Sequence, residues 1–187
     1  LLKLKNWRSK VAADLNLLVP EFKQKVEELL GKCNKQGIVM RSYYTLRDPY
    51  EQARLWRQSR PSEHIKYIIN DLKKDGALFL ANCLESVGPQ NGRWATNALP
   101  GYSWHQWGEA VDAFWLVNGK SEWAPDKLID GKNGYKVYAA EAKKMGLTSL
   151  GSTLDDWPHV QLRQIEVSRA YSLTKINALM KEKFGKI

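Results

Sequence analysis

The strand-like segments of this 187-residue chain are short and far apart, and longer segments with helical spacing separate them. Short runs with strand-like apolar patterns are found at 38–40, 110–116 and 159–162. Apolar residues at helical spacing predict helices over 20–36, from Pro49 onward, over 62–87, over 135–145 and over 173–184. We therefore predict an α+β fold in which helices pack around a small antiparallel sheet.

The net charge of +9 is concentrated at the two ends of the chain. Residues 1–36 carry eight basic and four acidic side chains, and residues 163–187 carry six and two, whereas the middle is almost balanced. A basic protein favours anionic partners such as nucleic acid, a membrane surface or an acidic wall polymer. The balanced middle and the lack of a recognisable recognition motif argue against nucleic acid. No stretch reaches the 18 apolar residues of a spanning helix, so we expect no transmembrane segment.

The two cysteines, Cys33 and Cys83, are too few to form a disulfide framework in a chain of this length. They form either one disulfide or two buried thiols, and we expect free thiols.

Two of the three histidines, His105 and His159, stand in short segments that also contain an aspartate. His105 precedes Asp112 by seven residues, and Asp156 precedes His159 by three. Two imidazoles and one carboxylate are a natural ligand set for catalytic zinc, with the fourth position left for water. His105 can approach Asp112 if the chain turns back at Gly108, and Asp156 is then placed to act as a general base. Each residue taken alone has an ordinary structural explanation, so the hypothesis depends on their joint pattern.

That joint pattern is Ser-x-His-x-x-Gly-x-Ala-x-Asp over residues 103–112, followed by Asp-x-Pro-His over 156–159. It resembles the zinc peptidases of the VanY/D-alanyl-D-alanine carboxypeptidase superfamily. The segment 46–52, Leu-Arg-Asp-Pro-Tyr-Glu-Gln, is similar to the superfamily's Tyr-Arg-Ser-x-x-Glu-Gln, and Thr-Asn-Ala-x-Pro-Gly over 96–101 is also typical of it. These motifs follow the family's order and span about residues 20–162.

The resemblance implies a zinc peptidase whose Zn2+ is bound by His105, Asp112 and His159. It implies that Asp156 is the general base. Arg47 would stabilise the oxyanion or hold a substrate carboxylate.

Two further residues carry implied roles in substrate binding. Ser103 would orient the substrate or a metal ligand, and Gln52 would contact the substrate.

The motif Asp-x-Pro-His-x-Gln is similar to that of L-alanyl-D-glutamate endopeptidases from phage endolysins and wall-remodelling enzymes. The resemblance therefore favours hydrolysis of the first peptide bond of the peptidoglycan stem. Two alternatives stay open: a D,D- or L,D-carboxypeptidase acting on the stem terminus, and a non-catalytic wall-binding module. The implied partners are stem peptides and anionic wall polymers. We expect a monomer that acts in the cell envelope, either exported or phage-encoded.

The chain departs from the family pattern in two places. Tyr44-Thr45-Leu46 stands where the family usually shows Gly-Tyr. Residues 60–93 are longer than the usual link, so we predict one domain over 1–187 with a helical insertion at 60–93. This insertion either shapes the substrate cleft or is a remote packing element.

Four tryptophans cluster near the candidate site in the sequence, and they have two explanations. In the first, they stack on sugar rings or form the wall of the cleft. In the second, which we favour, they pack in the core and in loops. They are Trp94, Trp104, Trp107 and Trp115.

Overall fold

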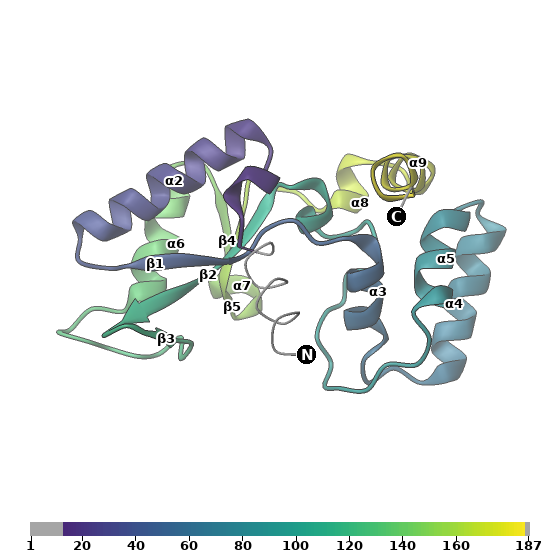
Figure 1. Cartoon of the computed structure of the whole chain (residues 1–187), viewed down its shortest axis with the longest axis horizontal. Coiled ribbons are helices and arrows are strands. Elements are labelled where there is room, and N and C mark those ends of the chain that lie inside the picture. Colours follow the sequence, from purple (N-terminus) through teal and green to yellow (C-terminus); the bar gives the residue numbers. More distant parts are fainter. Residues whose placement is uncertain (1–12, 186–187) are drawn as a thin grey trace. The chain divides into compact units, whose positions relative to one another are not determined.

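The computed structural model describes residues 13–185 and confirms the α+β prediction (Figure 1). The chain divides into two compact units, each built from two stretches of sequence. Among the described residues, the first unit contains 13–46 together with Trp107–Gln164, and the second contains Arg47–Gln106 together with 165–185.

The first unit is built on a small sheet whose pairings are all antiparallel, as predicted. The strand order is β1-β2-β5-β4, and β3 pairs with β2 outside this path. The strands are β1 (Met40–Tyr44), β2 (Ala110–Val117), β3 (Lys120–Glu122), β4 (Thr148–Leu150) and β5 (Asp156–Gln161). The strand predicted at 38–40 begins only at Met40, and β3 and β4, of three residues each, were not predicted.

Helices α2 (Pro20–Lys35) and α6 (Gly134–Lys144) pack against one face of this sheet (Figure 1). Pro20 occupies the first helical turn of α2, where its missing N–H costs nothing. The core between helices and sheet is apolar and almost completely buried; it includes Phe22, Val26, Leu29, Cys33, Met40, Val111, Ala113, Trp115, Tyr135, Tyr138, Ala142 and Val160. The short helices η1 (Leu15–Leu17) and α7 (Gly151–Leu154) complete the unit.

The alternation along β2 determines where polar side chains can lie. Val111, Ala113 and Trp115 belong to the core under the helices. Successive side chains of a strand point to opposite faces, so Asp112 and Phe114 lie on the other face of the sheet.

The second unit is helical. It contains α3 (Pro49–Arg57), α4 (Ser62–Lys74), α5 (Leu78–Ser86), all but the last residue of η2 (Trp104–Trp107), α8 (Val167–Ala170) and α9 (Leu173–Phe184). No helix among residues 13–185 combines the length and the apolar character needed to cross a membrane.

The helical spacing over 62–87 corresponds to two helices, because the chain forms α4 and α5 with a break at Gly76. Gly76 has a φ of +76°, the left-handed conformation that glycine adopts without strain. The N–H of Ala77 donates to the carbonyl of Leu72 at 2.8 Å, which ends α4 with a Schellman-type cap. A glycine that fits a helical pattern in the sequence therefore ends the helix here.

Helix α5 provides much of the core of the second unit. Its residues Leu80, Ala81, Cys83 and Leu84 are fully buried. Asn177 of α9 caps its first turn, since its Oδ1 accepts hydrogen bonds from the N–H groups of Phe79 at 3.0 Å and Leu80 at 3.2 Å. The segment 60–93 therefore includes a central packing element of this unit.

Cys33 and Cys83 are both free and buried, as expected. Burial raises the pKa of Cys33 to about 11 and that of Cys83 to about 12. Trp104 and Trp115 are buried, which confirms packing for these two tryptophans. Trp94 is exposed, and the Arg60 guanidinium lies 3.8 Å from the centroid of its ring.

Candidate metal centre

Asp112 and His159 are brought together by the pairing of β2 with β5. The two residues lie directly opposite each other in the antiparallel register, on the face away from the helical core. Their side chains meet, with His159 Nδ1 3.1 Å from Asp112 Oδ1. Since both residues are held by strand pairing, this contact is rigidly positioned.

His105 lies on η2, just before a turn that leads into β2. Gly108 makes this turn with a φ of +73°, and its carbonyl accepts a hydrogen bond from the N–H of Val19 at 3.0 Å. A Cβ at this position would lie 3.0 Å from the carbonyl oxygen of Leu17, so the turn requires glycine.

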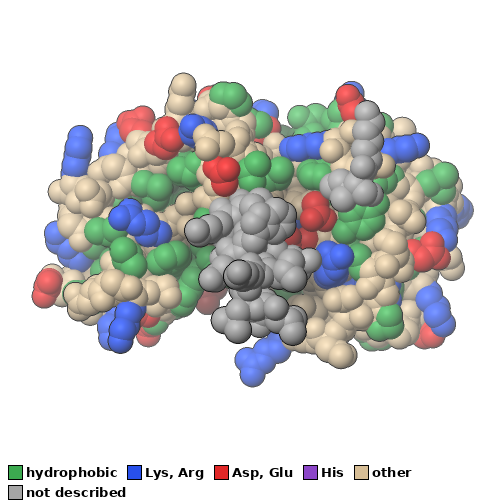
Figure 2. Space-filling model, in the orientation of Figure 1, with side chains coloured by type: hydrophobic (Ala, Val, Ile, Leu, Met, Phe, Trp, Pro, Cys, Tyr) green, Lys and Arg blue, Asp and Glu red, His purple; other side chains and the backbone are tan. Residues whose placement is uncertain are grey.

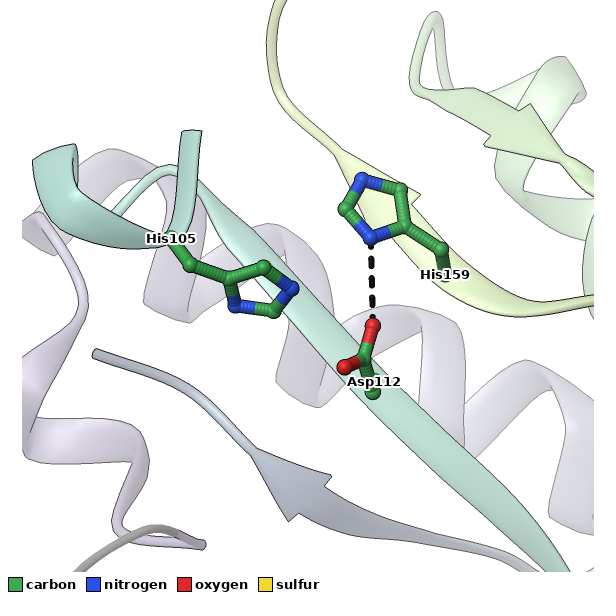
Figure 3. A group of neighbouring side chains, drawn as sticks. All are labelled: His105, Asp112 and His159. Atoms are coloured by element: carbon green, nitrogen blue, oxygen red, sulfur yellow. Dashed lines mark hydrogen bonds and ion pairs between the residues drawn. The ribbon is translucent and has the colours of Figure 1, made fainter. Parts of the chain in front are cut away.

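The ligand atoms of His105, Asp112 and His159 all lie within 4.8 Å of one another. Figure 3 shows the three side chains, which come from η2, β2 and β5. This convergence, and the turn at Gly108, are the arrangement that the sequence predicts. Such a set is suited to hold a metal ion with one coordination position left open.

Gln161 defines which nitrogen of His159 faces Asp112. Its Nε2 donates to the carbonyl of Arg163 at 2.7 Å, so its Oε1 is the atom that faces His159 Nε2, at 3.0 Å. Because Oε1 can only accept, His159 Nε2 carries the hydrogen. The lone pair of Nδ1 is then directed toward the oxygen of Asp112.

Two acceptors 3.1 Å apart repel unless a cation or a proton lies at the same place. Burial alone would lower the pKa of His159, but the hydrogen bond and charge of Asp112, the charge of Asp156 and the bond to Gln161 raise it overall. The surroundings of Nδ1 therefore favour positive charge. This donor set fits a divalent metal ion.

Asp156 is the first residue of β5 and is exposed to solvent. Its negative charge is among the causes that raise the pKa of the His159 imidazole, after the hydrogen bond and charge of Asp112. The neighbouring carboxylate of Asp155 is used differently: this residue has a φ of +56°, and its Oδ1 accepts the indole N–H of Trp157 at 2.8 Å. Of the two neighbouring carboxylates, that of Asp155 is therefore engaged by an indole, and that of Asp156 acts electrostatically on His159.

A second layer of polar contacts, which the sequence did not indicate, supports β5. Arg163 forms a two-point ion pair with the buried carboxylate of Glu109. The N–H of Leu162 donates to the carbonyl of Glu109 at 2.9 Å. These contacts hold the backbone of Arg163, to which Gln161 is anchored. The signal available in the sequence was the spacing of His159 and Gln161, which places both side chains on one face of a strand.

Arg47 and Gln52 lie together in the second unit. Arg47 Nη1 donates to Gln52 Oε1 at 3.0 Å, and the N–H of Arg47 donates to the carbonyl of His105 at 3.2 Å. Gln52 is fully buried, and its Nε2 donates to the carbonyl of Ala98 at 2.7 Å. The polar atoms of Gln52 are thus engaged inside the protein, and its contact with the substrate stays a prediction.

Ser103 and Gln106 hold η2 in place. The hydroxyl of Ser103 accepts the N–H of His105 at 3.4 Å, and the N–H of Ser103 donates to Gln106 Oε1 at 3.1 Å. Gln106 is buried and donates from Nε2 to Gln52 Oε1 at 3.2 Å. Its carbonyl accepts a hydrogen bond from Lys183 Nζ at 3.1 Å. These bonds orient the turn that carries His105.

Comparison with known proteins gives a family match. The model of the VanY family, described as D-alanyl-D-alanine carboxypeptidase, matches residues 15–149. The match includes His105 and Asp112 and ends before Asp156 and His159. The place of His159 in the candidate site is supported by the geometry described above. None of the curated proteins compared with the chain matches it significantly.

Two solved structures are similar to the chain at low identity. One is the L-Ala D-Glu endopeptidase ChiX of Serratia marcescens, with 17% identity, coverage of 83% of this chain and 86% of the other, and a TM-score of 0.42. The other is a variant of the vancomycin-resistance D,D-pentapeptidase VanY from a VanB-type cassette in complex with Zn(II). Its identity is 15%, its coverage 86% and 78%, and its TM-score 0.44.

Proposed function

The chain belongs to the VanY family of D-alanyl-D-alanine carboxypeptidases, and from this premise we propose that it hydrolyses a peptide bond of the peptidoglycan stem with a bound zinc ion. The family makes the chain a metallopeptidase that acts on peptidoglycan. The observation that carries the proposal is the convergence of His105, Asp112 and His159 within 4.8 Å. Three protein ligands with an open fourth position are typical of catalytic zinc, which supplies Lewis-acid activation of water and of a carbonyl group.

For the remaining residues we propose the following roles. Asp156 accepts the proton of the attacking water and returns it to the amine of the leaving peptide. Arg47 presents its guanidinium to the oxyanion or to a carboxylate of the substrate, and its bond to Gln52 holds the guanidinium in place. Ser103 orients the turn that carries His105.

Among the bonds of the stem, we favour the one between L-Ala and D-Glu. The motif Asp156-x-Pro158-His159-x-Gln161 is similar to that of endopeptidases with this specificity. A second candidate, D,D-carboxypeptidase activity on the stem terminus, is favoured by the description of the matching family. In both cases we propose a monomer that works on the cell wall, exported or phage-encoded, with the basic ends attracted to anionic wall polymers.

Digestion of defined muropeptides, followed by mass spectrometry of the products, tests the proposal. We expect cleavage that a chelator abolishes and that zinc restores, with the product masses identifying the bond. Chelator-resistant cleavage, or zinc-loaded protein that cleaves no stem peptide, would contradict it.

Variants separate metal binding from proton transfer. His105→Ala should lose zinc by elemental analysis. Asp156→Ala should keep zinc and lose activity by about 10²–10⁴-fold, the usual contribution of a general base. The matched control is Asp155→Ala, which removes the neighbouring carboxylate and should keep most of the activity. If Asp155→Ala were instead the inactive variant, Asp155 would be the base.

A further inference from the structure

Three aromatic side chains form a cluster in the first unit, here called the ring cluster: Tyr43, Phe114 and Trp123. The ring centroids of Tyr43 and Trp123 are 5.1 Å apart at 80°, an edge-to-face contact. Those of Phe114 and Trp123 are 5.5 Å apart at 42°. The cluster is therefore a packed group of rings with defined mutual orientations.

The ring cluster remains open to solvent. Tyr43 is 49% exposed and Trp123 is 44% exposed. Figure 2 shows hydrophobic side chains at the surface over the region of β1 to β3, among scattered charged ones. Packed rings that keep nearly half of their surface in water offer an apolar area to a ligand.

One member of the cluster, Phe114, lies on the same face of β2 as Asp112. Phe114 follows Asp112 by two residues on β2, which corresponds to about 7 Å along a strand. Trp123 directly follows Glu122, which pairs with Trp115, so it continues the register opposite Phe114. The distance from the candidate metal centre to the start of the apolar surface is therefore about the length of one or two residues of an extended substrate peptide.

A cation borders the cluster. Arg41 pairs with Phe114 across β1 and β2 and lies one position from the core residue Met40, so its side chain is on the face of the ring cluster. Arg41 is exposed. It adds hydrogen-bond donors beside the rings, as a polar ligand with an apolar face requires.

We propose that the ring cluster binds the sugar to which the stem peptide is attached, with one ring of the glycan packed on Trp123 and Tyr43. This inference rests on the proposed function. A pyranose ring has faces of C–H groups that pack on aromatic rings, while its hydroxyl and acetamido groups hydrogen-bond with donors such as Arg41.

The distances agree with cleavage near the sugar. An extended peptide spans about 3.3–3.6 Å per residue. The bond between L-Ala and D-Glu is one residue from the sugar, whereas the terminal bond of a pentapeptide stem is four residues away, or about 13–14 Å. A cluster that begins about 7 Å from Asp112 suits the first of these bonds. The ring cluster therefore also supports endopeptidase cleavage over cleavage at the stem terminus.

The test compares two substrates that differ only in the sugar: a disaccharide-linked stem peptide and the same peptide without sugar. We expect wild-type protein to have the higher kcat/KM on the sugar-linked substrate. Trp123→Ala and Tyr43→Ala should each reduce this preference by about 2- to 10-fold, the range for one aromatic contact, and leave the rate on the free peptide unchanged. The matched control is Tyr67→Ala, which removes an exposed tyrosine, 65% exposed, from α4.

A second measurement keeps the test independent of peptidase activity. The indole N–H signal of Trp123, assigned with Trp123→Phe, should shift on addition of a disaccharide of N-acetylated sugars to zinc-loaded protein. The absence of a shift, or equal losses on both substrates in folded variants with full zinc content, would overturn the inference. Equal losses would show that the rings serve the peptide or the fold. If neither substrate were cleaved while the indole signal shifted, the proposed function would fail and the sugar site would stand.

Discussion

Replacing Gln161 by leucine should weaken zinc binding without removing any metal ligand. In the wild-type protein, Gln161 Oε1 accepts from His159 Nε2, and this bond leaves the lone pair of Nδ1 facing Asp112. Leucine fills a similar volume and accepts no hydrogen bond. His159 is 6% exposed, so water does not easily replace the lost acceptor.

The size of the effect follows from two ways in which His159 can respond. If the hydrogen stays on Nε2, a buried donor has no acceptor, which costs about 1–3 kcal/mol. If the hydrogen moves to Nδ1, the lone pair that faces Asp112 is lost, and it must be regained before a metal binds. The first response destabilises the metal-free and the zinc-bound protein alike. The second corresponds to a fall in zinc affinity of about 10- to 100-fold, the usual effect of removing a partner of a metal-binding histidine.

Competition with a chelator of known zinc affinity measures this loss, and ring nitrogen NMR of the metal-free protein reports which nitrogen carries the hydrogen. Gln161→Glu should retain affinity within a few-fold, because a carboxylate also accepts from Nε2. Gln90→Leu, which removes a glutamine bonded to the carbonyl of Val87 in the second unit, serves as the matched control. The reasoning fails if Gln161→Leu binds zinc as tightly as wild type, or if the glutamate variant loses as much as the leucine variant.

Two further predictions concern the core. At pH 8 a thiol reagent should label neither Cys33 nor Cys83 in folded protein, and both after unfolding. The pKa values of about 11 and 12 leave only on the order of 0.1% or less of each thiol ionised. Rapid labelling of native protein would show that burial does not protect the two thiols. Gly101→Ala should lower the free energy of unfolding by about 2–4 kcal/mol in urea titrations, since its φ is +85° and a Cβ would lie 2.5 Å from Ile176. Gly119→Ala, with a φ of +75° and no atom within 4 Å, should lose only about 1–2 kcal/mol, so equal losses would refute the packing argument.

The parts of the fold that depend on local patterns could be predicted from the sequence. Alternation along β2 identified Val111, Ala113 and Trp115 as one face, and they lie in the core. Helix α2 begins at Pro20 and ends within one residue of its predicted end. The strands β3 and β4 were missed because three residues are too few to show a period.

The candidate site divides in the same way. The types and order of His105, Asp112 and His159 indicate a metal centre, and strand pairing brings the last two into contact. The contact between Arg163 and Glu109 joins residues 54 positions apart and exists only once the chain is folded. Burial of Gln52 likewise depends on tertiary packing, which its polar character gives no reason to expect.

The interleaving of the two units along the chain has a consequence for biosynthesis. Tyr44 of β1 pairs with Asp112 of β2, 68 positions later, and at 5–20 residues per second this partner is made about 3–14 s after β1. The cap on helix α5 is made later still, because Asn177, which accepts the N–H of Phe79, follows that residue by 98 positions. The first unit is complete only after Gln164 has been made, and the second only after α9 has been made. Until then, the β1 edge and the apolar face of α5 are exposed to chaperones and proteases. A chain that stops before α9 would lack the cap on α5 and part of the helical core, and we expect the cell to degrade it rather than to keep it as a shortened enzyme.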